Sequence, residues 1–175
     1  VREGDVLAIS EPRNNFPLRR DAVKTLLVAG GIGVTPLLAM AQALGHQQLA
    51  HEFHYFAQNE GQLAFRDRLD GLERTLVPHL GLTPPQTGER LREILSGYRD
   101  DMHLYLCGPG PMLEAARGIA TELGWPDKAV HFEYFKNTNE IDDSSTFEIA
   151  LARSCLTLTV PAGKSILEVM REAGV

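Results

Sequence analysis

Short apolar runs alternate with longer segments of helical periodicity over most of the chain. A continuous apolar run such as residues 24–29 is typical of a strand that is buried on both faces of a sheet. The runs predict strands over residues 5–10, 24–29, 50–57, 74–79, 102–107 and 129–135. The segments between them predict helices over residues 36–44, 62–69, 89–95 (capped by Thr87) and 111–123. From residue 24 on, this alternation predicts an α/β fold with a five-stranded, parallel, doubly wound sheet.

A different pattern begins after residue 135. Residues 136–145 are polar and without periodicity, which indicates an interdomain linker. Residues 147–151 and 156–160 then alternate between apolar and polar positions, and we predict that they pair as a hairpin. Ser165 is placed to cap a final helix over residues 166–172.

Composition and charge narrow the class of protein. The 175 residues are 43% hydrophobic and 23% charged, which is ordinary for a globular protein. The net charge of -6, with both signs interspersed, leaves no basic stripe and argues against nucleic-acid binding. No apolar run reaches the roughly 20 residues of a membrane-spanning helix, so we expect no membrane association. Two cysteines, Cys107 and Cys155, do not make a disulfide framework, and we expect a cytoplasmic protein.

The strand over residues 24–29 ends in a turn with three glycines in four residues, Gly30 to Gly33. Glycines let the backbone approach a ligand closely, and the N–H groups at the start of the following helix offer an anion site. A pyrophosphate fits there, with Thr35 as helix cap and further donor and with Pro36 at the first helical position. We therefore expect Gly33→Val to weaken dinucleotide binding. The alternative is that the glycines only form a tight turn between strand and helix.

A second turn, residues 107–112 (CGPGPM), comes after the strand over residues 102–107. In a doubly wound sheet of order 3-2-1-4-5, the strands that carry the two turns are neighbours at the topological switch point. Both turns then face one crevice, which is where ligands bind in such sheets. Cys107 is expected beside that ligand, and the alternative for it is a small buried hydrophobic residue.

Other side chains give weaker signals. His54, His103 and His131 lie inside strands and lack the spacing of metal ligands, so we expect no metal site. Phe135 ends the last strand of the predicted sheet. It is placed either to close over the crevice or to pack against the linker, and its spacing does not decide between the two.

Taken in order, the motifs resemble a known family. GGIGVTP, YLCGPGPM and HFEYF resemble the ferredoxin-NADP reductase superfamily. The terminal LTLTVPAGKSILEVMREAGV resembles the opening of a plant-type [2Fe-2S] ferredoxin domain, as in the phthalate dioxygenase reductase family, which includes vanillate demethylase reductases. This resemblance implies the end of an FMN-binding β-barrel over residues 1–20, an NAD-binding domain over 21–135, the linker over 136–145 and the start of a ferredoxin domain over 146–175.

The resemblance also implies a function. In that family NADH reduces FMN, and electrons pass singly to the [2Fe-2S] cluster and on to a Rieske-type oxygenase that acts on aromatic rings or removes O-methyl groups. It places the pyrophosphate and the flavin edge at residues 31–35, and the nicotinamide and flavin ring at the candidate catalytic residues Cys107 and Phe135. The expected cofactor-binding residues are Gly30, Gly31, Ile32, Gly33, Val34, Thr35, Pro36, Ala57, Gln58, Cys107, Gly108, Pro109, Met112 and Phe135.

The sequence departs from the family pattern in ways that limit these expectations. The flavin-binding barrel residues and the four cluster cysteines lie outside it, so we expect FMN and the cluster only in a full-length protein and little activity from this chain alone. Residues 57–59 (AQN) lack the arginine of many relatives, which favours NADH over NADPH unless Arg66 or Arg68 reaches back. Two other functions stay open: a ferredoxin reductase-like oxidoreductase with a different acceptor, and a non-catalytic NAD-binding module.

Overall fold

A computed structural model of the protein describes residues 2, 4–72, 74–135 and 145–175. The chain divides into two compact units, residues 1–136 and residues 137–175. The linker predicted over residues 136–145 lies, apart from Ser145, outside the described residues.

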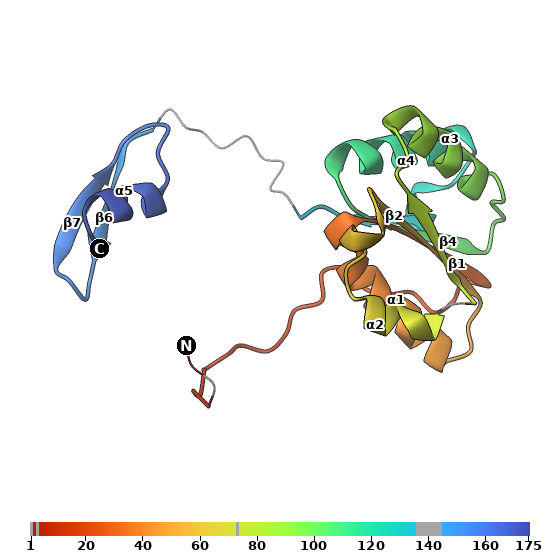
Figure 1. Ribbon diagram of the computed structural model, residues 1–175, viewed down its shortest axis with the longest axis horizontal. Coiled ribbons are helices and arrows are strands. Elements are labelled where there is room, and N and C mark those ends of the chain that lie inside the picture. Colours follow the sequence, from red (N-terminus) through yellow and green to blue (C-terminus); the bar gives the residue numbers. More distant parts are fainter. Residues whose placement is uncertain (1, 3, 73, 136–144) are drawn as a thin grey trace. The chain divides into compact units, whose positions relative to one another are not determined.

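The described residues of the first unit form a five-stranded parallel sheet, which confirms the predicted fold class. The strand order is β3-β2-β1-β4-β5, so β1 lies at the centre (Figure 1). The topological switch point lies between β1 and β4, because β2 and β3 are added on one side of β1 and β4 and β5 on the other. The strands are β1 (Lys24–Gly30), β2 (His51–Ala57), β3 (Leu76–Leu80), β4 (Met102–Cys107) and β5 (Val130–Glu133). Six of the seven residues of β1 are buried, as its apolar run predicts.

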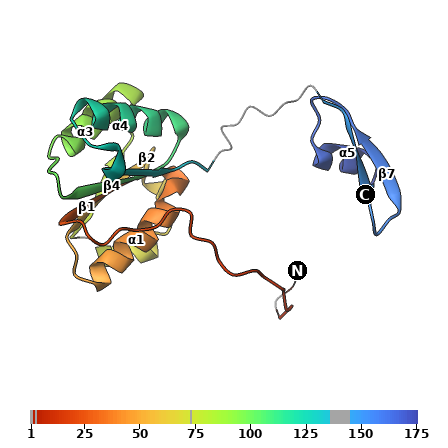
Figure 2. The same cartoon turned by 180° about the vertical axis from the view of Figure 1, so that it is seen from behind.

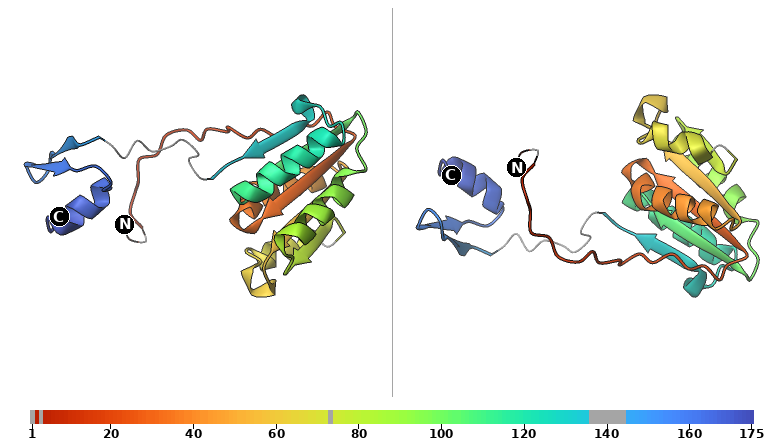
Figure 3. Two further views of the ribbon diagram at one scale, coloured as in Figure 1. Left: turned by 90° about the horizontal axis from the view of Figure 1, so that it is seen from above. Right: turned by 90° about the horizontal axis from the view of Figure 1, so that it is seen from below.

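Helices cover both faces of this sheet. On the face that we call the α1 face lie α1 (Val34–His46) and α2 (Arg66–Leu69), and on the α3/α4 face lie α3 (Pro84–Leu95) and α4 (Gly110–Glu122) (Figures 1 and 3). Short 3-10 turns add η1 (Gly31–Gly33), η2 (Glu60–Gln62), η3 (Asp70–Leu72) and η4 (Asp127–Ala129). None of the helices in the described ranges is long and apolar enough to span a membrane.

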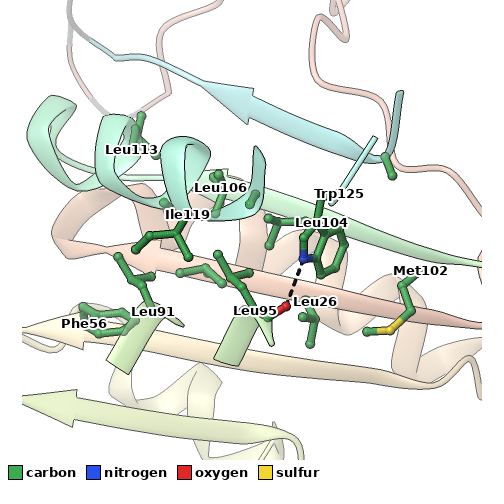
Figure 4. Packing of buried hydrophobic residues seen from close by; sticks show 14 residues of the cluster. Leu26, Phe56, Leu91, Leu95, Met102, Leu104, Leu106, Leu113, Ile119 and Trp125 are labelled. Atoms are coloured by element: carbon green, nitrogen blue, oxygen red, sulfur yellow. Dashed lines mark hydrogen bonds between the residues drawn. The ribbon is translucent and has the colours of Figure 1, made fainter. Parts of the chain in front are cut away.

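Successive strand residues point to opposite faces of the sheet and contribute to two separate hydrophobic cores, one on each face. On the α3/α4 face, Leu26, Leu104 and Leu106 pack against both helices (Figure 4). Here the indole Nε1–H of Trp125 donates a hydrogen bond of 3.0 Å to the Leu95 carbonyl, which ties the end of α4 to the end of α3. On the α1 face, the intervening strand residues, including Phe53, Tyr55 and Tyr105, pack against α1.

Two predicted helices differ from those in the structure. The helix predicted over residues 89–95 begins at Pro84, because Thr83 and Gln86 form a capping box with Pro84 in the first turn. The helix predicted over residues 62–69 is instead a 3-10 turn followed by the single turn of α2. The prediction of a cap at Thr87 was therefore wrong by one turn.

The strand predicted over residues 5–10 is absent from the structure. Val6 is 97% exposed and Ile9 is 89% exposed, and no described strand pairs with this segment. A strand needs a partner for its backbone N–H and C=O groups, so an alternating pattern alone does not form one. Further along, Phe16 and Leu18 pack on the α1 face, where the segment passes beside α1 (Figure 2). That residues 1–20 end a flavin-binding barrel stays a prediction.

The second unit contains the predicted hairpin and helix at the predicted positions. β6 (Phe147–Leu151) and β7 (Leu156–Val160) pair in antiparallel register, and α5 (Ile166–Glu172) comes after them. Ser165 caps α5 through a capping box with Glu168, as its position before an apolar run predicts. Val160 of β7 and Val169 of α5 are the buried residues of this unit in its described part, and α5 packs against β7.

Candidate functional site

The two glycine-rich turns meet at the carboxyl edge of the sheet. β1 and β4 are neighbours, and their ends are paired at Ala29 and Cys107. A Cβ atom added to Gly108 would lie 3.0 Å from the Gly30 Cα atom, and one added to Gly30 would lie 2.7 Å from Met112 Sδ. The turns are thus packed backbone against backbone, and a side chain at either glycine would push them apart.

Gly33 has a structural role that its sequence pattern does not reveal. A Cβ atom at this position would lie 2.1 Å from the carbonyl oxygen of Cys107 and 2.7 Å from the Gly108 nitrogen. The close backbone approach predicted here is therefore an approach to the neighbouring turn. The expectation that Gly33→Val acts by blocking a ligand was wrong in its mechanism, because the clash occurs within the protein.

Gly31 is the glycine that faces open space. Its backbone φ is +52°, a left-handed conformation that favours glycine, and a Cβ atom there would meet nothing within 4 Å. Gly31 also lines a cleft on the α3/α4 face. Of the three glycines in this turn, it is the one positioned to let a ligand approach the backbone.

The cleft has a volume of about 560 Å³, within the range of small-molecule and cofactor sites. It runs from the two glycine-rich turns to the ends of β2 and β3 and to the start of α3. Its lining is mainly apolar, with a few amide, hydroxyl and imidazole groups. The lining residues are Gly30, Gly31, Phe56, Ala57, Gln58, Gln62, His79, Leu82, Pro84, Thr87, Gly88, Pro109, Pro111, Met112 and Ala115.

The structure brings only part of the expected cofactor-binding set to this cleft. The residues of that set that line it are Gly30, Gly31, Ala57, Gln58, Pro109 and Met112. The others do not line it, and these are Ile32, Gly33, Val34, Thr35, Pro36, Cys107, Gly108 and Phe135. Val34 is buried in the α1 face, whereas Ile32 is 62% exposed.

Thr35 does not cap α1. The helix already begins at Val34, and the Thr35 hydroxyl donates a hydrogen bond of 3.0 Å back to the Ile32 carbonyl. The preceding 3-10 turn, η1, continues directly into the helix, so Gly33 occupies the cap position without any side-chain bond. The predicted cap at Thr35 was therefore wrong, while its role as a phosphate donor stays a prediction.

The two candidate catalytic residues have contrasting surroundings. Cys107 is fully buried on the α1 face, and burial together with the nearby Glu133 carboxylate raises the pKa of its thiol to about 11. A thiol in that state is a small core residue and is unsuited to act as a nucleophile. Phe135 lies just after β5 and is 51% exposed, which leaves its ring free to contact another group. Their places beside the nicotinamide and the flavin stay predictions.

Phe56 and His79 are cleft residues that sequence reasoning missed. They face each other across β2 and β3, and their rings stack with centroids 4.4 Å apart. His79 Nε2 lies 3.1 Å from Nδ1 of His54, which the sequence placed correctly inside a strand. The strand register creates this group, and that register cannot be read from the weakly apolar run of β3.

No lysine, arginine, aspartate or glutamate lines the cleft in the described part of the chain. Arg66 pairs with Glu60 at 3.3 Å, and the Arg68 guanidinium lies 5.9 Å from the centre of the Phe65 ring. Neither arginine therefore reaches back to the cleft. The described residues also hold no cluster of three or more His, Cys, Asp or Glu side chains that could bind a metal ion.

Known proteins are similar to this chain in both sequence and fold. The family model described as the oxidoreductase NAD-binding domain matches residues 27–118. The chain is 38% identical over 170 residues to oxidoreductase NdmD of Pseudomonas putida, covering 96% of this chain and 29% of that protein. It is 35% identical over 179 residues to the vanillate O-demethylase oxidoreductase of Pseudomonas sp. (strain HR199 / DSM 7063), covering 100% of this chain and 56% of that protein.

A solved structure of phthalate dioxygenase reductase matches with a TM-score of 0.69 at 35% identity, covering 94% of this chain and 52% of that one. The chain thus spans about half the length of this protein and of the vanillate O-demethylase oxidoreductase, and less than a third of NdmD. These matches confirm the resemblance to the phthalate dioxygenase reductase family that the sequence motifs indicated. The family model covers the central strands and both glycine-rich turns, and on that basis the chain belongs to the oxidoreductase NAD-binding domain family.

Proposed function

We propose that this chain is the NADH-binding part of a cytoplasmic reductase that passes electrons from NADH through FMN and a [2Fe-2S] cluster to a Rieske-type oxygenase component. The observation that carries the proposal is the cleft at the switch point of the sheet, bordered by two turns in backbone contact. Dinucleotides bind at this position in doubly wound folds. The related proteins include reductases of vanillate O-demethylase and of phthalate dioxygenase.

The residues present fit a dinucleotide. Gly31 would hold the pyrophosphate, because the phosphate can approach a backbone that carries no side chain. Gln58 and Gln62 offer amide groups for ribose hydroxyls, while Pro109 and Met112 border the half of the cleft next to β4. When bound, NADH supplies two electrons as a hydride, and the role of the chain is to bind and orient it.

The described residues do not fit a [2Fe-2S] cluster. They include no cluster of cysteine ligands, and Cys155 stands alone in the turn between β6 and β7. The iron–sulfur cluster would therefore be held by another part of a longer protein, and we propose the same for FMN. The phthalate dioxygenase reductase structure is described as modular, with electron transfer from pyridine nucleotides to [2Fe-2S], which supports this division of roles.

The lining of the cleft favours NADH over NADPH. The 2′-phosphate of NADPH carries up to two negative charges near neutral pH and needs a cation or several donors. Among the described cleft residues there is no lysine or arginine, and the two nearby arginines are engaged elsewhere. The described lining residues thus give the 2′-phosphate no permanent positive charge.

A cytochrome P450 is the second candidate acceptor. A solved type IV self-sufficient cytochrome P450 monooxygenase matches 94% of this chain at 31% identity with a TM-score of 0.65. The match covers only 21% of that protein, so it shows that the same pair of units also occurs within a haem monooxygenase.

The cleft can be tested with NAD⁺ and one filled position. Ala115 is exposed and lines the cleft from α4, so Ala115→Trp fills the cleft without disturbing the core. We expect it to weaken NAD⁺ binding by about tenfold, or 1.4 kcal/mol, in isothermal titration calorimetry. Thr121→Trp, also exposed on α4 but outside the cleft, is the matched control. Equal affinity of both variants would place the dinucleotide elsewhere.

The electron-transfer role requires the full-length protein. We expect NADH to reduce ferricyanide and cytochrome c through it, and to support turnover of a purified Rieske-type oxygenase. Turnover of a cytochrome P450 alone would favour the second candidate. A protein that binds NADH but reduces neither dye would be a non-catalytic NAD-binding module.

Phe135 can be tested in the same full-length protein. Because its ring is 51% exposed, Phe135→Ala should change the free energy of unfolding by less than about 0.5 kcal/mol. The rate of flavin reduction by NADH in this variant, measured by stopped flow, should change much more than its stability does. Phe132→Ala, on β5 and 37% exposed, controls for loss of an aromatic ring. Equal rates in both variants would show that Phe135 only packs.

A further inference from the structure

His79 differs from every other residue of the cleft. Of the described residues that line the cleft, it alone carries an ionisable side chain. Its ring stacks on Phe56 at 4.4 Å and lies 5.3 Å from the ring of His54. The hydrogen bond of 3.1 Å between His79 Nε2 and His54 Nδ1 leaves the Nδ1 atom of His79 outside this pair.

We propose that His79 sets the dinucleotide specificity of the cleft: with a neutral ring the cleft prefers NAD(H), and with a protonated ring it also accepts the 2′-phosphate of NADP(H). The inference rests on the proposed function, because it assumes that the cleft binds a dinucleotide. It adds the residue that distinguishes the two dinucleotides and makes the distinction depend on pH.

The position of His79 matches that of the group that differs between the two ligands. In doubly wound folds the pyrophosphate lies at the first strand-to-helix turn, and the adenosine ribose lies toward the end of the second strand. Here those places are Gly31 and the end of β2 at Ala57 and Gln58. His79 lies on β3, beside the end of β2 and on the same cleft, so it borders the ribose side.

Burial and, to a smaller extent, the neighbouring groups hold the His79 ring neutral in the absence of an anion. Burial, His54 of β2 and Arg90 of α3 together lower the pKa of His79 to about 4. Behind the pair, Glu52 of β2 lies 3.6 Å from His54 Nε2, and Lys24 of β1 occupies the same carboxylate at 2.6 Å. Burial also lowers the pKa of His54, so His54 does not supply a permanent charge.

A phosphate dianion in the cleft reverses this balance for His79. An opposite charge within a few ångströms favours the protonated imidazole, so binding raises the His79 pKa and takes up a proton. By linkage, NADP⁺ binding must then tighten as the pH falls toward the pKa of the bound state. NAD⁺ lacks the 2′-phosphate, and its binding should not depend on this proton.

The test compares NAD⁺ and NADP⁺ binding by isothermal titration calorimetry at pH 7.5 and pH 5.5. His79→Phe keeps a ring to stack on Phe56 but cannot take up a proton, and circular dichroism verifies its fold. Relative to this variant, wild-type affinity for NADP⁺ should rise about fivefold or more between pH 7.5 and pH 5.5, while the ratio for NAD⁺ stays within about twofold. The free 2′-phosphate itself gains a proton near pH 6, and this step in solution is the same for every variant.

Two further variants keep the inference falsifiable. His79→Arg carries a permanent charge and should bind NADP⁺ about tenfold more tightly than wild type at pH 7.5. His46→Phe removes an exposed histidine at the end of α1 and should keep the wild-type pH profile. The inference is overturned if wild type and His79→Phe share one NADP⁺ profile, or if His79→Arg gains nothing. Absence of NAD⁺ binding by wild type would instead refute the proposed function.

Discussion

The two faces of the sheet differ most where the strands end. On the α1 face the edge is closed, because Cys107 and Tyr105 are fully buried and Phe16 of the N-terminal segment packs against the Tyr105 ring. On the α3/α4 face the same edge is open and forms the cleft beside Phe56 and His79. The strands and turns are shared, so the difference comes from the segment that connects each strand to its helix.

The closed face results from an uninterrupted connection. α1 begins directly after η1, and its first residue, Val34, is buried against the sheet. α3 begins four residues after β3, and this gap and Pro84 leave room beside the end of β3. One face therefore holds the two turns together, while the other face is free to receive a ligand.

Gly33 offers the strongest test of the closed face. Gly33→Val places a branched side chain against the Cys107 carbonyl, which a Cβ atom alone would approach to 2.1 Å. We expect the free energy of unfolding to fall by about 3 kcal/mol, measured by urea denaturation, because the two turns must separate. Gly118→Val, at an open position on α4, is the control and should change stability by less than about 0.5 kcal/mol. Wild-type stability of Gly33→Val would mean that the turns are not in contact.

How much the sequence predicts depends on whether a feature is local. The buried strands and the cap at Ser165 follow from apolar runs and from cap position, and they were predicted at or near their observed bounds. The partner of Gly33 and the stack of His79 on Phe56 arise from the pairing of distant strands. Nothing near either residue in the sequence signals that partner, so glycine clustering predicted the position of the site but not the role of each glycine.

A substitution at Gly31 tests the open face, as the substitution at Gly33 tests the closed face. Gly31→Ala keeps the space free but strains a backbone with φ of +52°, so stability should fall by about 1 kcal/mol. Its Cβ atom points into open space beside the cleft, and we expect NAD⁺ affinity to fall about fivefold, or 1 kcal/mol, in calorimetry. Gly124→Ala has φ of +83° and open space away from the cleft, so it should lose stability alone. If both variants bind NAD⁺ equally, Gly31 is only a turn residue.

Tyr105 tests how the N-terminal segment covers the closed face. Its hydroxyl accepts a hydrogen bond of 2.8 Å from the Arg19 N–H and donates one of 3.3 Å to the Pro17 carbonyl. Tyr105→Phe should lower stability by about 1 kcal/mol and speed hydrogen exchange at the Arg19 amide. Tyr55→Phe removes a similar bond, to the Ala64 N–H, and should leave exchange at Arg19 unchanged. Equal exchange in both variants would show that the segment is held by Phe16 instead.

The smallest expected effect separates the two histidine pairs. His103 and His131 form a pair on the α1 face with ring nitrogens 2.8 Å apart, as His54 and His79 do on the other face. Burial lowers the pKa of all four, so the unfolded chain binds more protons than the native protein below pH 6.5. Stability must therefore fall as the pH drops from about 6.5 to about 4.

His79 and His131 should not contribute equally to this loss. Asp21 faces the pair on the α1 face and opposes the lowering of the pKa of both His103 and His131. His79 has no carboxylate among the groups that shift its pKa, which is lowered to about 4. His79→Phe should therefore flatten the fall in unfolding free energy between pH 6.5 and 4 more than His131→Phe does. If His131→Phe instead reduces the pH-dependent fall in unfolding free energy more than His79→Phe does, Asp21 does not offset the lowered pKa of His131. The closed face would then be the more acid-sensitive of the two.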